Sequence, residues 1–117
     1  MGKSKYRLNL SDIAFVPITH GSAQKKVFLK NNEIETMLTQ FAYSRFNPGD
    51  LCEMHNHPTM EEYFFVYKGS GTYTIGEEIL ILREGDFLRI PAKIEHQVNA
   101  DKGQSLELIY FGIATKK

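Results

Sequence analysis

The stretch HNHPTMEEYFFVYKG, residues 55–69, brings histidines and glutamates together within one short segment. In an extended strand, residues i and i+2 point to the same face, so the imidazoles of His55 and His57 project side by side. Two neighbouring imidazoles can chelate a metal, and Glu61 or Glu62 would add an oxygen ligand. This ligand mixture suits divalent iron, manganese, nickel, zinc or copper. The residues therefore predict a divalent metal site.

The choice between the two glutamates stays open at this point. They are neighbours on an expected strand over 61–67, so their side chains face opposite ways. Glu62 shares its face with Phe64 and Val66, whereas Glu61 shares its face with aromatic residues alone. Because both faces are apolar, the pattern predicts a strand buried on both sides, either between two packed sheets or at a subunit interface.

Short apolar runs separated by turn residues occupy most of the chain, which is typical of an all-β protein. Strands of about five residues at spacings near ten indicate a sandwich or a barrel. One short helical turn is expected around 30–36. The expected strands cover residues 37–46, 51–55, 61–67, 72–75, 79–83, 87–90, 96–100 and 106–113, with edge strands at 13–18 and 27–29.

Composition excludes several classes of protein. The chain has 117 residues, which fits one domain, and its 14 basic and 14 acidic residues give a formal net charge of zero. We therefore expect no nucleic-acid or membrane-surface partner. Cys52 is the single cysteine, so no internal disulfide forms and a reducing compartment fits best. Without a signal-peptide pattern or an apolar run of about 18 residues, we expect a cytoplasmic protein.

Two longer spacings resemble a known family. Residues 49–69 follow the pattern G-x5-HNH-x4-E-x6-G, and residues 85–96 follow GD-x4-P-x4-H, with 15 residues between the two segments. These patterns resemble the first and second motifs of the cupin superfamily, in a small single-domain form. The resemblance covers 37–113 and implies a double-stranded β-helix, or jelly-roll barrel. Residues 1–36 would then add N-terminal strands and a loop to the same domain.

The resemblance also implies a ligand set. It selects Glu62 over Glu61 and adds a distant fourth ligand, so the metal would be held by His55, His57, Glu62 and His96. The chain departs from the second motif at Lys93, where glycine is usual, and at Asn99, where the motif asparagine falls one place early. Neither position is a ligand. We expect a less regular turn before His96, and Lys93 would add a cation near the barrel mouth.

Other candidate residues receive plainer interpretations. His20 matches no motif, so we expect a loop histidine and not a ligand. Cys52 lies three residues before His55, so on a regular strand it faces the other way and packs as a small apolar residue. Some of the remaining polar or amphipathic groups could line a cavity, although each alone is expected to be solvated: Arg45, Arg89, Lys93, Gln97 and Tyr110.

Three functions are compatible with such a site. An octahedral metal with four protein ligands keeps about two open positions, which favours an enzyme: a dioxygenase, or an isomerase that polarises a carbonyl. The alternatives are a non-catalytic module that binds or senses a small molecule, and a metal-independent sugar-modifying cupin that uses histidine acid–base chemistry. The intact ligand set argues against the last. The sequence assigns no catalytic residue and no substrate, because fold does not determine chemistry.

Assembly follows from the same strand. A barrel interior covers only one face of 61–67, so the other apolar face requires a different cover. Related cupins are often dimers, which suggests the same by analogy. We therefore expect a homodimer with a largely apolar interface, acting on a small molecule.

Overall fold

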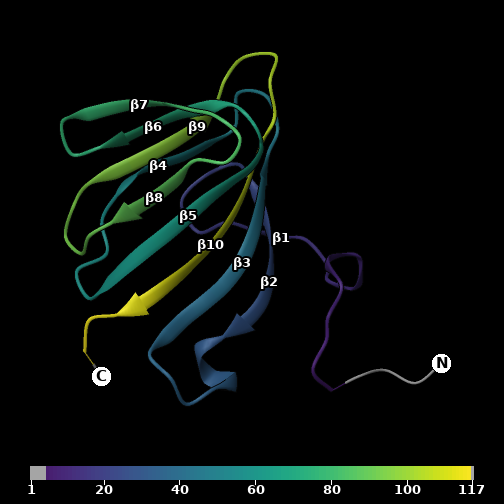
Figure 1. The fold of residues 1–117 in the computed structure, drawn as a ribbon. Helices are drawn as coiled ribbons and strands as arrows, with labels where there is room; N and C mark the ends of the chain where they lie inside the picture. Colours follow the sequence, from purple (N-terminus) through teal and green to yellow (C-terminus); the bar gives the residue numbers. More distant parts are fainter. Residues whose placement is uncertain (1–4, 117) are drawn as a thin grey trace.

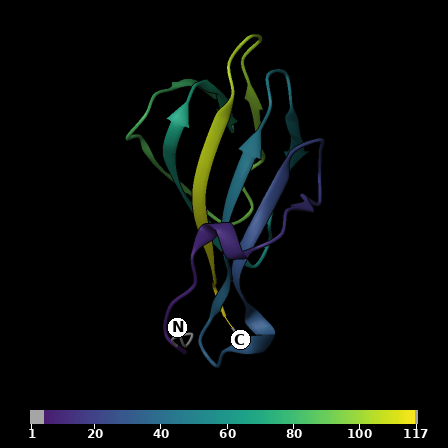
Figure 2. The same cartoon turned by 90° about the vertical axis from the view of Figure 1, so that its right-hand side faces the viewer.

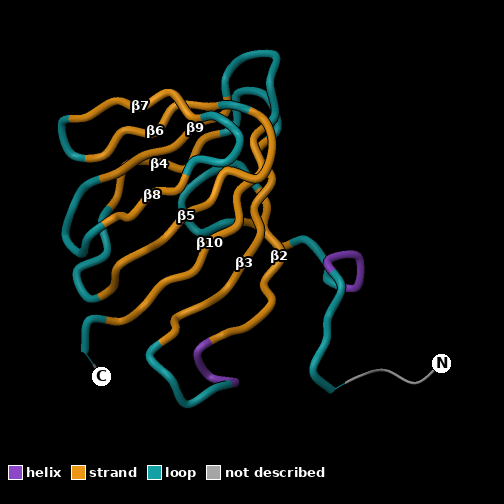
Figure 3. Tube along the Cα trace, viewed as in Figure 1, coloured by secondary structure: helices purple, strands orange, loops and turns teal. Residues whose placement is uncertain are grey.

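The computed structural model describes residues 5–116, in which strands predominate and the helical segments are two short 3-10 turns (Figure 3). The turns are η1 (Leu10–Asp12) and η2 (Asn31–Glu33). The strands are β1 (Val16–Pro17), β2 (Gln24–Lys30), β3 (Leu38–Phe46), β4 (Leu51–His55), β5 (Met60–Gly69), β6 (Gly71–Ile75), β7 (Glu78–Leu82), β8 (Phe87–Ile90), β9 (His96–Ala100) and β10 (Leu106–Ala114).

These strands form two sheets, one of six strands in the order β1-β2-β3-β10-β5-β8 and one of four in the order β4-β9-β6-β7 (Figure 1). Neighbouring strands are antiparallel, and β3 and β10 run side by side through the centre of the larger sheet (Figure 2). The chain crosses repeatedly between the sheets, as β4 and β5 illustrate. The predicted all-β jelly-roll barrel is confirmed.

The core lies between the two sheets. Burial alternates residue by residue along β9 and β10, as expected for strands with one face toward the interior. Val98 from the smaller sheet and Leu108 from the larger one therefore both belong to the buried cluster. Aromatic rings contribute to this core, and Phe64 stacks on Tyr110 at a centroid distance of 4.9 Å.

The expected strands between 37 and 113 are confirmed, with ends displaced by a few residues. The N-terminal region differs more. The expected strand over 13–18 shortens to the two residues of β1, and the one over 27–29 lengthens into β2, which pairs with β3. The helical turn expected around 30–36 is η2, whereas η1 was not predicted.

The face of β5 opposite the core is exposed in the single chain. Phe65 and Tyr67 keep 43% and 45% of their surface accessible, so the explanation by two packed sheets is wrong. The sandwich covers one face of β5 only, the face of Glu62 and Phe64. A subunit interface on the other face stays a prediction.

An aromatic row crosses this outer face. Successive ring centroids lie 5.0–6.4 Å apart from β2 to β8, in the order Phe28, Phe41, Phe111, Tyr63 and Phe87. Cross-strand aromatic pairs of this kind stabilise a sheet, and their outer surfaces stay available to a partner. Among residues 5–116, no helix has the length and apolar character needed to cross a membrane.

Candidate metal centre

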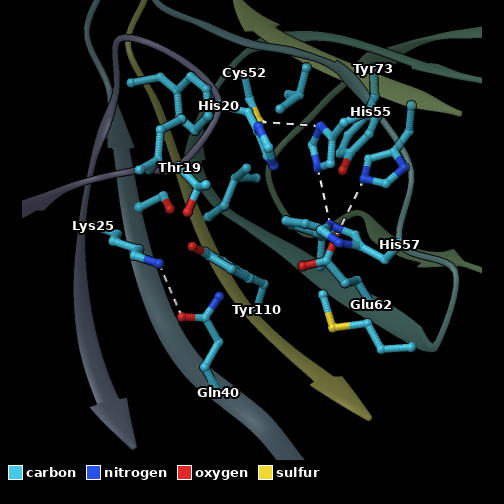
Figure 4. A pocket seen from close by; sticks show the side chains of 18 residues that line it. Thr19, His20, Lys25, Gln40, Cys52, His55, His57, Glu62, Tyr73 and Tyr110 are labelled. Carbon is cyan, nitrogen blue, oxygen red and sulfur yellow. Dashed lines mark hydrogen bonds and ion pairs between the residues drawn. The ribbon is translucent and has the colours of Figure 1, made fainter. Parts of the chain in front are cut away.

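Four side chains meet at one point between the sheets (Figure 4): His55, His57, Glu62 and His96. One potential ligand atom from each lies within 4.8 Å of all the others. The Nε2 atoms of His55 and His57 are 3.0 Å apart. Glu62 Oε1 lies 3.2 Å from His57 Nε2 and 3.4 Å from His96 Nε2. The group implied by the resemblance is therefore assembled by the fold.

Both sheets contribute to this cluster. His55 ends β4 and lies opposite His96, the first residue of the neighbouring β9. Glu62 comes from β5 in the other sheet and is buried. His57 lies in the loop between β4 and β5, where its carbonyl accepts a 2.9 Å hydrogen bond from the Lys93 amide. The site thus depends on the packing of the two sheets.

The histidine tautomers suit a metal. His55 Nδ1 lies 2.6 Å from the Glu53 carbonyl, and His96 Nδ1 lies 2.9 Å from the Ile94 carbonyl. A carbonyl oxygen only accepts, so Nδ1 carries the proton in each ring and Nε2 presents its lone pair to the cluster. The buried His96 Nε2 has no hydrogen-bond partner. Such an orphaned nitrogen, aimed at a carboxylate and two imidazoles, fits a bound divalent cation.

The electrostatics also fit. Burial opposes ionisation of Glu62, but the neighbouring imidazoles of His57 and His96 outweigh it and lower its pKa to about 2. Burial, aided by the adjacent histidines, lowers the pKa of His55, so its ring is neutral near pH 7. Burial also disfavours the charged form of His96, but Glu62 and the Ile94 carbonyl together outweigh it, so the pKa of His96 is raised. A proton and a metal compete for the same nitrogen there.

Glu61 lies outside the cluster, on the outer face of β5. Its carboxylate forms an ion pair with Arg89 at 2.5 Å and accepts a hydrogen bond from the Tyr63 hydroxyl at 2.7 Å. The strand register that the residues alone left open therefore directs Glu62 inward and Glu61 outward.

A β-bulge corrects the interpretation of Cys52. Cys52 pairs with Val98 and His55 pairs with His96, so three steps along β4 match two steps along β9. The extra residue turns both side chains inward, whereas a regular strand would separate them. The thiol packs against the core, as expected, but it also lines the cavity, and its sulfur lies 4.0 Å from His55 Nδ1.

The cluster forms one wall of a cavity of about 260 Å³. Most of its surface is apolar, supplied by Ile18, Phe46, Met60, Phe64, Val98 and Leu108. Beyond the cluster, the polar lining consists of Thr19, His20, Lys25, Gln40, Ser44, Cys52, Tyr73 and Tyr110. A small, mostly apolar hollow with a few polar groups has the character of a small-molecule site.

The other polar residues that the sequence offered as possible cavity residues differ in their exposure to solvent. Tyr110 is buried and lines the cavity, so its expected solvation is wrong, whereas Arg45 and Arg89 are exposed and Gln97 is half-buried. Tyr110 shares a face of β10 with Leu106 and Leu108, a signal that the sequence contained.

His20 lies in a turn, as expected, and outside the ligand group. Its ring nevertheless lies against that of His55, at a centroid distance of 4.4 Å. Its neighbour Gly21 forms a bridge with Cys52, which fixes this turn against β4. Sequence reasoning missed both His20 and Lys25 as cavity residues.

Lys93 does not line the cavity, so its expected role as a cation at the mouth is not supported by its position. It has φ = 73°, the single positive φ at a non-glycine position among residues 5–116. This region is left-handed and favours glycine, which gives a physical reason for the glycine usual at this place in the motif.

We therefore predict that Lys93→Gly stabilises the protein by about 0.5–1 kcal/mol, because relief of the left-handed strain exceeds the added freedom of the unfolded chain. Urea unfolding measures the effect. Lys93→Ala is the control, since it removes the charge and keeps the Cβ. Equal stabilities of the glycine and alanine variants would contradict the backbone explanation.

Comparison with known proteins settles the family. The cupin domain family matches residues 42–112 of the chain. The chain is a cupin. The match includes both motifs and all four clustered residues, so the resemblance on which the ligand set was based is confirmed at the level of the family.

Individual relatives are more distant. Over 75 residues the cupin is 28% identical to an oxalate decarboxylase of Arthroderma benhamiae. The matched segment spans 64% of this chain but 18% of that relative. A crystal structure described as a predicted oxalate decarboxylase from Thermotoga maritima superposes with a TM-score of 0.85 at 18% identity, covering 92% of this chain and 98% of that one. The polyketide cyclase RemF from Streptomyces resistomycificus gives a TM-score of 0.81 at 14% identity, covering 99% and 81%. These structures share the fold.

Proposed function

We propose that this cupin is a metal-dependent enzyme acting on a small molecule, with a divalent cation held by His55, His57, Glu62 and His96. The observation that carries the proposal is the convergence of these four ligand atoms within 4.8 Å at the wall of a mostly apolar cavity. The names of two relatives, an oxalate decarboxylase and a polyketide cyclase, are compatible with small-molecule chemistry in such a barrel.

The bound cation would supply either dioxygen activation, if it is redox-active, or polarisation of a carbonyl, if it is not. The chain itself prepares the site for either role. Backbone carbonyls hold His55 and His96 in the orientation that presents Nε2, and an apolar wall that includes Phe64 lines the cavity. The dioxygenase-like reaction is the version we favour, because an apolar wall protects reactive species from water.

A metal exchange tests the proposal. The purified protein is loaded with ferrous iron and, separately, with zinc, and oxygen uptake and substrate loss are followed over diketones, catechols, sugar phosphates and small carboxylic acids. Oxygen consumption with iron alone supports the dioxygenase-like reaction. Oxygen-independent turnover with zinc assigns the isomerase-like reaction. Turnover without any metal would favour the metal-independent cupin, and binding without turnover would favour a sensing module.

We also propose that the aromatic row on the outer face of the larger sheet pairs with a second copy of the chain. Phe87, at the β8 end of this row, keeps 63% of its surface accessible. The chain has no net charge, so self-association brings no overall repulsion. The expected assembly is a homodimer.

Light scattering at micromolar concentration should therefore give twice the chain mass for the native protein and the monomer mass for Phe87→Ser. Ile79→Ser is the matched control, since Ile79 is 69% exposed on β7 of the other sheet. A native monomer would contradict the dimer, and dissociation caused by the control alone would move the interface to the smaller sheet.

A further inference from the structure

Lys25 contributes an ammonium group to the cavity, on the side away from the metal cluster (Figure 4). It lies on β2 and is half-buried. Its Nζ donates a 3.2 Å hydrogen bond to Gln40 Oε1, and it forms no ion pair with any carboxylate of residues 5–116. A half-buried ammonium that is hydrogen-bonded to a neutral amide has no counter-charge in contact with it.

The pKa of Lys25 reflects this burial. Burial lowers the pKa of Lys25; the charge of Glu62 opposes this shift without cancelling it, and Lys30 adds a smaller lowering. A second hollow shares Lys25, Gln40 and Met60 with the cavity and continues to Lys30. Two cations therefore line the hollow that adjoins the cavity on this side.

Gln40 is oriented to assist an anion. Because its Oε1 accepts from Lys25, its amide nitrogen is left as a donor. Figure 4 shows this nitrogen, the Lys25 ammonium and the Tyr110 hydroxyl on the same side of the cavity. Donors that line the same side of a cavity favour a negatively charged oxygen there, because charge-assisted hydrogen bonds are strong.

The net charge of the cavity lining indicates the charge of the ligand that the cavity binds. Apart from the histidines, Lys25 and Glu62 are the charged residues that line it. With a divalent cation in the cluster and neutral imidazoles, the site carries a net charge of about plus two in a mostly apolar hollow. A dianion neutralises this charge. The volume of about 260 Å³ restricts the ligand to a few non-hydrogen atoms beyond its two charged ends.

We propose that Lys25 and Gln40 bind one carboxylate of a small dicarboxylic acid whose other end lies at the histidine–glutamate cluster. This inference deepens the proposed function by naming its substrate class and rests on that function for the cluster end alone. Lys25 is then a specificity-determining residue, since it rejects neutral and singly charged analogues that leave its ammonium unpaired.

Calorimetric titration tests the inference with malonate, succinate and glutarate, each against its own monoamide, which keeps the shape and removes one charge. The protein is used zinc-loaded and metal-free. In the native zinc-loaded protein each dianion that fits should bind at least about tenfold more tightly than its monoamide. Lys25→Met should abolish this ratio, and Lys25→Arg should keep it.

Lys26→Met is the matched control. Lys26 is the next residue on β2, but its ammonium points away from the cavity and donates to the Leu10 carbonyl at 3.0 Å. The control should leave the ratio unchanged. Thermal unfolding and zinc content establish that each variant is folded and loaded.

The two proposals fail separately. If zinc binds but dianions and monoamides bind alike, or Lys25→Met has no effect, the anion end is wrong and the metal site stands. If zinc does not bind, the metal proposal fails, and the metal-free titration alone decides whether carboxylates depend on Lys25. Tighter, Lys25-dependent binding of a phosphonate-ended analogue, phosphonoacetate, would overturn the dicarboxylate class.

Discussion

His96→Ala is expected to reduce the affinity for zinc or ferrous iron by about 100-fold or more, because it removes a buried imidazole from the proposed ligand group. His96 is buried at the start of β9, and its Nε2 atom has no partner apart from the cluster itself. Elemental analysis by mass spectrometry after dialysis against a weak chelator measures metal occupancy.

His20→Ala is the matched control for that experiment. The His20 ring lies as close to His55 as the His96 ring does, with both centroids 4.4 Å away, yet His20 is not part of the ligand group. Its loss should leave occupancy within about threefold of the native value. Full occupancy in the His96 variant would reject the four-residue site, and a larger loss in the His20 variant would place the metal nearer the turn.

The residues alone predicted the histidine pair and one of two glutamates, and the resemblance to the cupin motifs selected Glu62 and added His96. His55 and His57 follow from the period of two, and the strands on either side are short enough to be recognised by their bounding turns. The choice of Glu62 needed the family motif, because both faces of β5 are apolar. The structure adds the observation that decides it physically, the outward pairing of Glu61 with Arg89.

The sequence alone could not show which side chains of β2 and β4 face the cavity, because this depends on strand register and on bulges. QKKVFLK, the sequence of β2, contains two adjacent lysines, and nothing local indicates which one faces the cavity. The pairing of Lys25 with Ser44 on β3 decides this, and such pairing is a long-range property. The bulge that brings Cys52 to the same side as His55 likewise has no local signature in LCEMH.

Lys93 shows the opposite case, in which a departure from the motif was visible but its meaning was not. The sequence presented a lysine where glycine is usual, and the natural interpretation was an added charge. The structure shows instead a left-handed backbone conformation whose amide holds the His57 carbonyl. The backbone requirement of the turn therefore persists although the residue that best satisfies it is absent.

The paired variants Glu62→Gln and Glu61→Gln should differ strongly in metal affinity, although the two residues are adjacent. Glu62→Gln replaces the single carboxylate of the cluster by an amide of nearly equal shape, which removes the negative charge and one strong oxygen ligand. We expect its metal affinity to fall by about 100-fold. Glu61→Gln removes a charge that pairs with the exposed Arg89, so its metal affinity should stay within about twofold of the native value.

Without metal, the two variants should also differ in how their free energy of unfolding depends on pH. In the native metal-free protein the Glu62 pKa of about 2 means that its ionised form is held by His57 and His96, and this stabilisation is present above the ordinary carboxyl pKa and is lost as the pH falls toward 2. Glu62→Gln should remove that acid sensitivity, whereas Glu61→Gln should retain it. Metal titration and urea unfolding at pH 7 and pH 4 measure both effects. Equal metal affinities, or a larger loss in Glu61→Gln, would reject the strand register that directs Glu62 to the metal.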